Sequence, residues 1–414
     1  MTAIQRNLLN DTSHRFIVNP AGRRSRKTLI AKRKILYAAL RNPGHRYFHG
    51  APTRDQAKDI FWEDVKQQYR LFLAESPSES KLKIRLLNGS EIYIVGLDKP
   101  QRIEGQPWNG CHITEFADLK PGAWQNNIRP VLSDTRGFAI LDGVPEGRNF
   151  YYDLALYAAG GALPETKPIK GAYADNDDWA YYAWFSADVL EPDEIDAAKR
   201  ELDPRTFRQE FEASFEDIEG LAYYQFSDKN LKAVEYRQNE KVHVGMDFNV
   251  NPMTAVLCHT DGVTLEQFGE IYLKNSNTFE MRDALKERFK PEQIIIYPDS
   301  TGRATESNAT ESDLSILKQA GFEIRAHRSN PRIKDRVNAV NSLICSAKGA
   351  IRYFVNAQNC HHTLNDFHRV ERLPDGRLNK KQEAEGLKHI TDALGYLVAY
   401  KWPVKQRKTY EIYR

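Results

Sequence analysis

Cysteine is scarce in this sequence, and its spacing supports neither a disulfide scaffold nor a cysteine-based metal site. Four cysteines occur in 414 residues, at Cys111, Cys258, Cys345 and Cys360, and no pair has C-x-x-C spacing. This pattern argues against a disulfide-stapled secreted fold or a zinc finger. We expect free thiols in a reducing compartment.

Long apolar runs are also missing. No stretch approaches the ~18 consecutive apolar residues that a membrane span requires, so no membrane association is predicted. The N-terminal segment "MTAIQRNLLNDTSHR" lacks an apolar core with a cleavage site, and we predict no signal peptide.

Charge of one sign does not dominate the sequence either. A net charge of +3 names no partner, although local basic patches could still bind nucleic acid.

What is present is an ordinary soluble composition, 41% hydrophobic and 28% charged, in a chain long enough for two or three domains. The first part alternates strands with helices, which predicts a largely parallel α/β sheet. The expected strands cover residues 15–18, 45–50, 110–116 and 137–144, with a hairpin over 81–96 turning at Asn88-Gly89. Helices are expected over 27–41 and 54–75.

A connecting region follows, with an aromatic run at Trp179, Tyr181, Tyr182 and Trp184. A buried strand and a base-stacking surface both remain possible for this run. We place domain boundaries at 1–205, 206–239 and 240–414.

The last domain begins with three strands from about Val242, two of them joined by an Asp261-Gly262 turn. Helices and strands then alternate up to a closing helix, "EGLKHITDALGYLVAYKW". We name this order ribonuclease-H-like by its likeness to that fold, because periodicity alone does not fix topology.

The stretch "PAGRRSRKTLIAKR", Pro20 to Arg33, follows a strand and opens a helix. A phosphate-binding loop reads G-x-x-x-x-G-K-[ST], and Lys27 and Thr28 fill its last two places. Gly22 supplies backbone near the start. Arg26 stands at the second glycine position and could point outward at a cost in loop geometry. A basic turn before a solvated helix is the alternative.

A nucleotide hydrolase also needs carboxylates at the end of a neighbouring strand. "GCHITEF" offers Glu115 there, a candidate to polarise the attacking water, but Thr114 stands where an Asp usually helps to hold magnesium. Glu115 could instead be a carboxylate favoured at a helix start.

Three aspartates suggest a second kind of chemistry. Asp247 interrupts an apolar strand, Asp299 ends another, and Asp392 lies on the closing helix. A carboxylate in an apolar strand is costly unless it is paired or bound to metal. Converging carboxylates suit two Mg²⁺ or Mn²⁺ ions and phosphodiester cleavage. Glu270 and His389 are possible further members, whereas turn and solvated-helix roles are the alternatives.

These motifs, and the order in which they follow one another along the chain, resemble those of the large subunit of tailed-phage terminases. "AGRRSRKT" is similar to the Walker A loop of that family, which often carries an arginine where Arg23 stands. "GCHITEF" is similar to its Walker B segment. Gly143, Pro145 and Gly147 match its G-T-P-x-G coupling motif, with Val144 in place of Thr. "HITDALGY" matches a nuclease motif.

The resemblance implies a P-loop ATPase motor over 1–205 and a ribonuclease-H-like nuclease over 240–414. It implies ATP with Mg²⁺, held by Gly22, Arg23, Lys27 and Thr28, with Thr28 touching the metal. Double-stranded DNA, a portal protein and a terminase small subunit are the implied partners. A homo-oligomeric ring on the portal is also implied. The protein would act in the host cytoplasm and transiently on the procapsid, not in the mature virion. The departures at Arg26, Thr114 and Val144 leave a second hypothesis, a DNA nuclease whose first domain hydrolyses ATP weakly or not at all.

Overall fold

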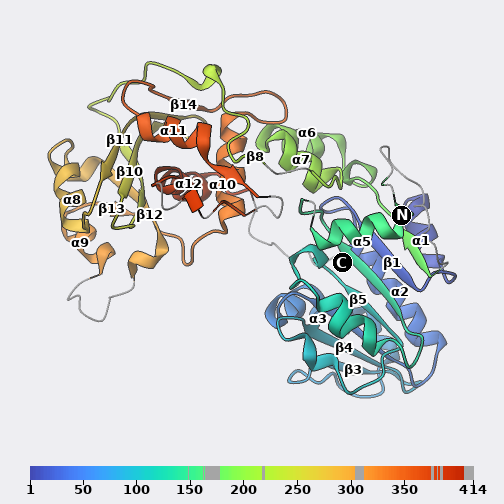
Figure 1. Cartoon of the computed structure of the whole chain (residues 1–414). Helices are drawn as coiled ribbons and strands as arrows, with labels where there is room; N and C mark the ends of the chain where they lie inside the picture. The colour runs from blue at the N-terminus through green and yellow to red at the C-terminus, as the bar shows by residue number, and fades with distance from the viewer. Residues whose placement is uncertain are drawn as a thin grey trace. The chain divides into compact units, whose positions relative to one another are not determined.

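The computed structural model describes residues 1–414 except 148, 162, 164–177, 217–219, 304–311, 374–376, 380, 383–385 and 405–414. The chain forms two compact units, shown in Figure 1. The first comprises Met1–Ile195 with Arg208–Glu216. The second comprises Asp196–Phe207 with the described residues of Asp217–Tyr410. The chain passes between the units after residues 195, 207 and 216, close to the proposed boundary at 205 but not to the one at 240. The proposed boundaries stay a proposal.

The first unit is built on a seven-stranded sheet with the order β3-β4-β2-β5-β6-β1-β7. All neighbouring pairs are parallel except β3 and β4, the predicted hairpin. The strands are β1 (Phe16–Pro20), β2 (Arg46–Ala51), β3 (Lys83–Arg85), β4 (Glu91–Gly96), β5 (Gly110–Ile113), β6 (Phe138–Gly143) and β7 (Trp179–Tyr181). The helices are α1 (Ala3–Asn10), α2 (Lys27–Arg41), α3 (Arg54–Tyr69), α4 (Arg129–Val131) and α5 (Phe150–Ala158).

Alternating residues send the strands' side chains to two separate cores, which places helices on both faces of this sheet. Ile17 and Ile140 pack with α1 and α2, whereas Phe16 and Leu141 pack on the opposite face, where α5 lies. The aromatic run 179–184 is buried. The strand hypothesis for that run is therefore confirmed. These buried rings are not accessible for stacking on bases.

The second unit contains a six-stranded sheet with the order β13-β12-β9-β10-β11-β14. Strands β9, β10 and β11 are antiparallel neighbours, whereas β12 is parallel to β9. The unit's strands are β8 (Gly220–Leu221), β9 (Val242–Asp247), β10 (Met253–Thr260), β11 (Leu265–Leu273), β12 (Ile294–Pro298), β13 (Glu323–Ile324), β14 (Tyr353–Val355) and β15 (Glu371–Arg372). The helices are α8 (Thr278–Lys286), α9 (Asp313–Gln319), α10 (Ile333–Ile344), α11 (His361–Arg369) and α12 (His389–Lys401), while α6 (Pro192–Glu201) and α7 (Pro204–Phe211) lie where the units meet in sequence.

Helices cover both faces of this sheet as well, with α8 and α9 on one side and α10, α11 and α12 on the other (Figure 1). Helix α12 lies directly on β9. A Cβ atom added at Gly245 would come 2.1 Å from the backbone oxygen of Ala393, so glycine is what allows this close approach. The contact holds the N-terminal half of α12 against β9.

These arrangements confirm the predicted fold class, a P-loop-type parallel sheet followed by a ribonuclease-H-like sheet. Both predicted hairpin turns are present between β3 and β4 and between β10 and β11. Within the described residues, no helix is both long and apolar enough for a membrane span. Among the cysteines, Cys111, Cys258 and Cys360 are buried, Cys345 is half-buried, and all four are free thiols.

Candidate active sites

The loop between β1 and α2 is held tightly at its start. A Cβ atom at Gly22 would lie 2.4 Å from Ser186 Oγ and 2.6 Å from the backbone oxygen of Phe211. The amide of Gly22 donates to Trp184 O at 3.0 Å, and Ser186 Oγ donates to Arg23 O at 2.7 Å. The loop is therefore pinned to the rest of the first unit on one side.

Arg26 takes the conformation that a glycine would take at this place. Its φ of 66° is left-handed, and its side chain is exposed. Left-handed backbone costs a non-glycine residue roughly 1–2 kcal/mol. The loop thus keeps its shape at a modest energetic cost.

Helix α2 begins at Lys27 without a side-chain cap from Arg26. The first amide groups of a helix have no partner within the helix, and together with the helix dipole they favour an anion. Lys27 is only 8% exposed, and within the described part of the chain no anionic partner contacts its ammonium group. A buried lysine beside an uncapped helix start fits a phosphate-binding role. Arg23, by contrast, is engaged with Glu210 through an ion pair of 2.8 Å in the same unit.

Beyond β5, Thr114 is buried and Glu115 is half-buried. Thr114 Oγ1 lies 3.5 Å from Thr28 Oγ1 of α2 and donates to Asp142 Oδ1 at 2.6 Å. Asp142, on the neighbouring strand β6, is fully buried. Sequence reasoning missed Asp142, although it shows the signal that revealed Asp247, a carboxylate inside an apolar strand.

The three predicted aspartates of the second unit lie on elements that meet at one sheet edge. Asp247 ends β9, and Asp299 follows the parallel neighbour β12, its amide donating to Met246 O at 3.0 Å. Asp392 lies in the first turn of α12, which packs on β9. Asp247 and Asp392 are 7% and 8% exposed, so neither is a freely solvated carboxylate.

Each aspartate has a protein partner. His389 Nδ1 lies 3.0 Å from Asp247 Oδ2, and Asn330 Nδ2 donates to Asp299 Oδ1 at 2.5 Å. Arg336 Nη2 forms an ion pair of 2.6 Å with Asp392 Oδ1.

Burial is the main cause that raises the pKa of Asp247. The hydrogen bond from His389 opposes this effect, and the nearby charges of Asp392 and Asp299 add to it. The mutual influence of these carboxylates indicates one shared electrostatic site.

The donor chemistry of this site fits a hard divalent cation, because carboxylate oxygens are what Mg²⁺ and Mn²⁺ prefer. In the described residues, however, no group of three or more His, Cys, Asp or Glu side chains is arranged to hold a metal ion. Glu270 is turned elsewhere. It accepts the amides of His362 and Thr363 at 2.7 and 3.0 Å, which caps the start of α11.

A further buried carboxylate, Asp366 on α11, lies under the first turn of α12. It accepts a hydrogen bond from Thr391 Oγ1 at 3.0 Å, and burial raises its pKa to about 7. The sequence signal was weak, because Asp366 shares the buried face of a short amphipathic helix with Thr363 and Phe367.

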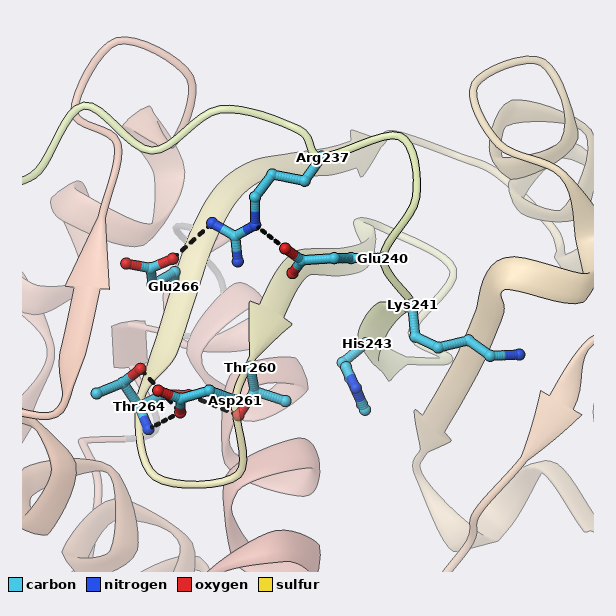
Figure 2. Close-up of a pocket in the computed structure, with 8 residues that line it drawn as sticks. All are labelled: Arg237, Glu240, Lys241, His243, Thr260, Asp261, Thr264 and Glu266. Atoms are coloured by element: carbon cyan, nitrogen blue, oxygen red, sulfur yellow. Dashed lines mark hydrogen bonds and ion pairs between the residues drawn. The ribbon is translucent and has the colours of Figure 1, made fainter.

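A cavity of about 530 Å³ in the second unit is a separate feature, shown in Figure 2. It is lined by Lys241, His243 and Thr260, at the opposite end of β9 from Asp247. Three of its charged lining residues are paired, since Arg237 contacts both Glu240 and Glu266 at 2.7 Å.

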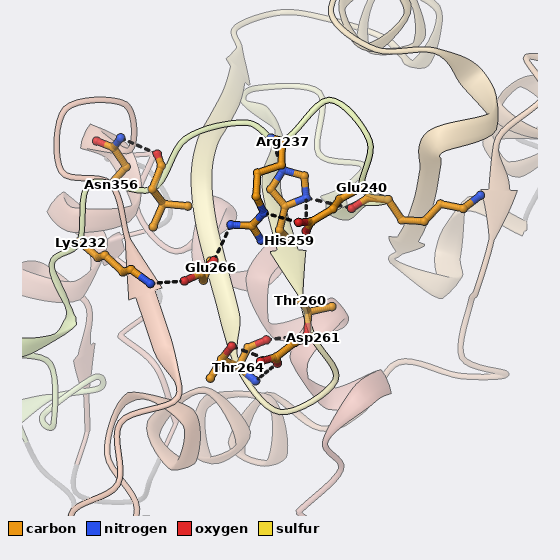
Figure 3. Close-up of polar contacts among 11 residues, drawn as sticks. Lys232, Arg237, Glu240, His259, Thr260, Asp261, Thr264, Glu266 and Asn356 are labelled. Atoms are coloured by element: carbon orange, nitrogen blue, oxygen red, sulfur yellow. Dashed lines mark hydrogen bonds and ion pairs between the residues drawn. The ribbon is translucent and has the colours of Figure 1, made fainter.

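The polar contacts around this cavity continue beyond its lining (Figure 3). Lys232 pairs with Glu266, and His259 Nε2 accepts the Arg237 amide at 2.9 Å. These contacts tie the segment before β9 to β10 and β11. We assign the cavity a structural role.

Comparison with known proteins agrees with the fold of the two units. Residues 244–401 match the family model described as the terminase RNaseH-like domain. The terminase large subunit of Escherichia phage T5 is 27% identical over 410 residues, covering 94% of this chain and 87% of that protein. The large subunit of Thermus virus P23-45 is 25% identical over 355 residues, covering 72% and 73%.

A solved structure of the large terminase from a thermophilic bacteriophage superposes with a TM-score of 0.67 at 14% identity. The match covers 96% of this chain and 98% of that one. A second structure of the same terminase, in complex with ATP-gamma-S, matches with a TM-score of 0.67 at 15% identity. At this identity the likeness concerns the fold.

Taken together, the two folded units and the comparisons define a two-part protein with an ATPase fold and a ribonuclease-H-like nuclease fold. Over most of its length the chain is therefore similar to the large subunits of phage terminases, the resemblance that its ordered motifs predicted.

Proposed function

We propose that this protein uses ATP hydrolysis to move double-stranded DNA into a procapsid and cuts the concatemeric DNA with its second unit. The observation that carries the proposal is a set of three carboxylates at one sheet edge, the buried Asp247 and Asp392 and the half-buried Asp299, in a chain whose helix α2 also starts without a side-chain cap. Buried charges of this kind are costly, and they are retained where chemistry needs them.

In the first unit, the uncapped start of α2 and Lys27 would bind the nucleotide's phosphates, and Thr28 would contact the accompanying Mg²⁺. Lys27 would neutralise negative charge that develops during phosphoryl transfer. Glu115, half-buried after β5, would orient the attacking water. Arg23 would act from the edge of the loop only if its pair with Glu210 opened.

In the second unit, Asp247, Asp299 and Asp392 would hold two Mg²⁺ or Mn²⁺ ions. Such ions, when bound, supply an activated water and stabilise the leaving oxygen. His389 orients the Asp247 carboxylate, and Arg336 balances the charge of Asp392 while the protein is free of metal. Arg336 already occupies Oδ1 of Asp392. A cation that bound to this oxygen would have to displace the guanidinium group in part.

DNA binding would rest on basic residues rather than on the carboxylates. Arg328 is exposed near this sheet edge, whereas Arg325 is paired with Glu323 at 2.7 Å. Lys334 and Arg332 lie at the start of α10. The basic tail "KQRK", residues 405–408, lies outside the described residues.

The motor function implies a portal protein and a small subunit as partners, with several copies of this chain forming a ring on the portal. The protein would work in the host cytoplasm and on the procapsid and would be absent from the mature virion. A packaging assay with portal-bearing procapsids tests this directly. ATP should protect DNA from added nuclease, and Lys27→Ala should abolish the protection. Protection that is equal without ATP, or in the variant, would contradict a motor role.

A second candidate function is a nuclease whose first unit binds nucleotide with little or no hydrolysis. The left-handed Arg26 and the neutral Thr114 favour it. Steady ATP turnover by the purified wild type, lost in Lys27→Ala, would exclude this alternative. Nucleotide binding without turnover, in the presence of DNA and portal, would support it.

A further inference from the structure

The first unit contains a chain of polar contacts that runs from the first turn of α2 across strands β5, β6 and β2. Thr28 Oγ1 is 3.5 Å from Thr114 Oγ1, and Thr114 donates to Asp142 Oδ1 at 2.6 Å. His112 Nε2 is 2.8 Å from Asp142 Oδ2, and His49 Nδ1 is 3.1 Å from His112 Nδ1. Asp142, His112 and His49 have no exposed surface, and Thr114 is 2% exposed.

Strand register explains how the carboxylate comes to lie beside Thr114. Ile113 on β5 is paired with Leu141 on β6, so the next residues along, Thr114 and Asp142, are also neighbours. Asp142 shares a face with Ile140, which packs against α2, the helix that carries Thr28. The carboxylate missing from the end of β5 is thus present one strand away and on the same face.

Hydrogen-bond directions give this arrangement a chemical consequence. The Asp142 carboxylate can only accept, so both the Thr114 hydroxyl and a His112 N–H point toward it. With its hydrogen committed to Asp142, Thr114 Oγ1 can only accept from Thr28. Successive hydrogen bonds of this kind strengthen one another, and a hydroxyl that donates to a strong acceptor has a more electron-rich oxygen.

A second observation is that buried polar atoms near Asp142 lack hydrogen-bond partners among the described residues of the protein, as expected where water or a polar ligand binds. Asn19 on β1 pairs in register with Asp142 and is fully buried. In the described part of the chain, neither amide atom of Asn19 has a hydrogen-bond partner, and the same holds for Ser25 Oγ in the loop. Buried polar groups are usually satisfied by protein, water or a bound group.

We propose that Asp142, acting through Thr114, replaces the missing carboxylate of β5 and polarises Thr28 Oγ1 as a ligand for the Mg²⁺ of the bound nucleotide. Asp142 is in this account a positioning residue, because it reaches the metal only through two hydroxyl groups. The inference rests on the proposed ATPase function and adds to it the group that completes magnesium binding.

The test measures the affinity of the full chain for ADP and for ATP-gamma-S by calorimetry, with Mg²⁺ and with the metal chelated. In the wild type, Mg²⁺ should tighten binding. Asp142→Asn should reduce that tightening about tenfold, because a hydrogen bond to a charged acceptor is replaced by one to a neutral acceptor. Affinity in the absence of Mg²⁺ should not change.

Three further variants make the result decisive. Thr114→Val keeps the volume of the side chain and removes the hydroxyl group that links Asp142 to Thr28, so it should reduce the Mg²⁺ effect as Asp142→Asn does. If Asp142→Asn fails to fold, Thr114→Val alone tests the proposal. Asp11→Asn removes another buried carboxylate of the first unit and should leave the Mg²⁺ effect intact. The exchange Thr114→Asp with Asp142→Thr should restore the effect, whereas Thr114→Asp alone sets two carboxylates side by side and should not.

The outcomes separate this proposal from the ATPase proposal. If Lys27→Ala loses nucleotide binding while Asp142→Asn and Thr114→Val keep the wild-type Mg²⁺ effect, the role of Asp142 is refuted and the nucleotide site stands. If the wild type shows no Mg²⁺-dependent nucleotide binding, the ATPase proposal fails and this inference fails with it.

Discussion

Replacing Asp366 by Asn should stabilise the protein at alkaline pH and leave it unchanged in acid. The folded-state pKa of Asp366 is raised by burial to about 7 from an ordinary value of 3.8. A group with a raised pKa in the folded state binds its proton more tightly when folded, so stability is lost as pH rises from 3.8 to 7. The difference corresponds to about 4 kcal/mol at pH 8, on the order of 1.4 kcal/mol for each pH unit.

Asn keeps the contact with Thr391 and does not ionise. The melting temperature of the full chain, followed from pH 5 to pH 8 with metals chelated, should therefore rise for Asp366→Asn relative to the wild type as the pH increases. Asp261 is a matched control, because hydrogen bonds from Thr264 and Val263 lower its pKa. Asp261→Asn should show no trend in this window. A difference between Asp366→Asn and the wild type that is independent of pH would refute the reasoning.

Three further results are expected. Lys27→Ala should abolish ATP hydrolysis, as measured by phosphate release, and unchanged turnover would remove the loop from the mechanism. Glu115→Gln should remove the turnover that the wild type shows without removing nucleotide binding, and a normal rate in this variant would show that the residue does not orient water. Gly245→Ala should destabilise the second unit by several kcal/mol, roughly the upper range for overpacking, because its Cβ would meet Ala393 O at 2.1 Å. Gly269→Ala, whose Cβ would have ordinary contacts from 3.5 Å, should be nearly neutral in the same thermal melt.

Much of the architecture was predictable because it depends on local signals. Alternation of strands and helices indicated the parallel sheet of the first unit. Asp261-Gly262 indicated the hairpin between β10 and β11 in the sheet of the second unit. Asp247 was recognisable because a carboxylate in an apolar strand is costly. Asp299 and Asp392 could be proposed because one ends an apolar strand and the other lies on the closing helix.

The contacts that were not predictable depend on register and packing between distant segments. Asp142 meets Thr114 only because β5 and β6 pair in one register, and the sequence drew attention to Thr114 alone. Arg336 pairs with Asp392 across 56 positions of the chain, through the packing of α10 on α12. Glu270 is drawn to the start of α11 by unpaired amides, which sequence spacing does not reveal.

The direct test of a motor and a nuclease in one chain measures both activities on the same preparations. The full-length wild type should linearise supercoiled plasmid with Mn²⁺ or Mg²⁺ and hydrolyse ATP. Asp392→Asn should lose cutting by at least about a hundredfold, since a shared two-metal site is disabled by losing one ligand, yet keep ATP hydrolysis and DNA binding. Lys27→Ala should keep cutting and lose hydrolysis. Cutting that persists in Asp247→Asn, Asp299→Asn and Asp392→Asn alike, or a wild type that is folded and cuts no DNA with either metal, would contradict the account.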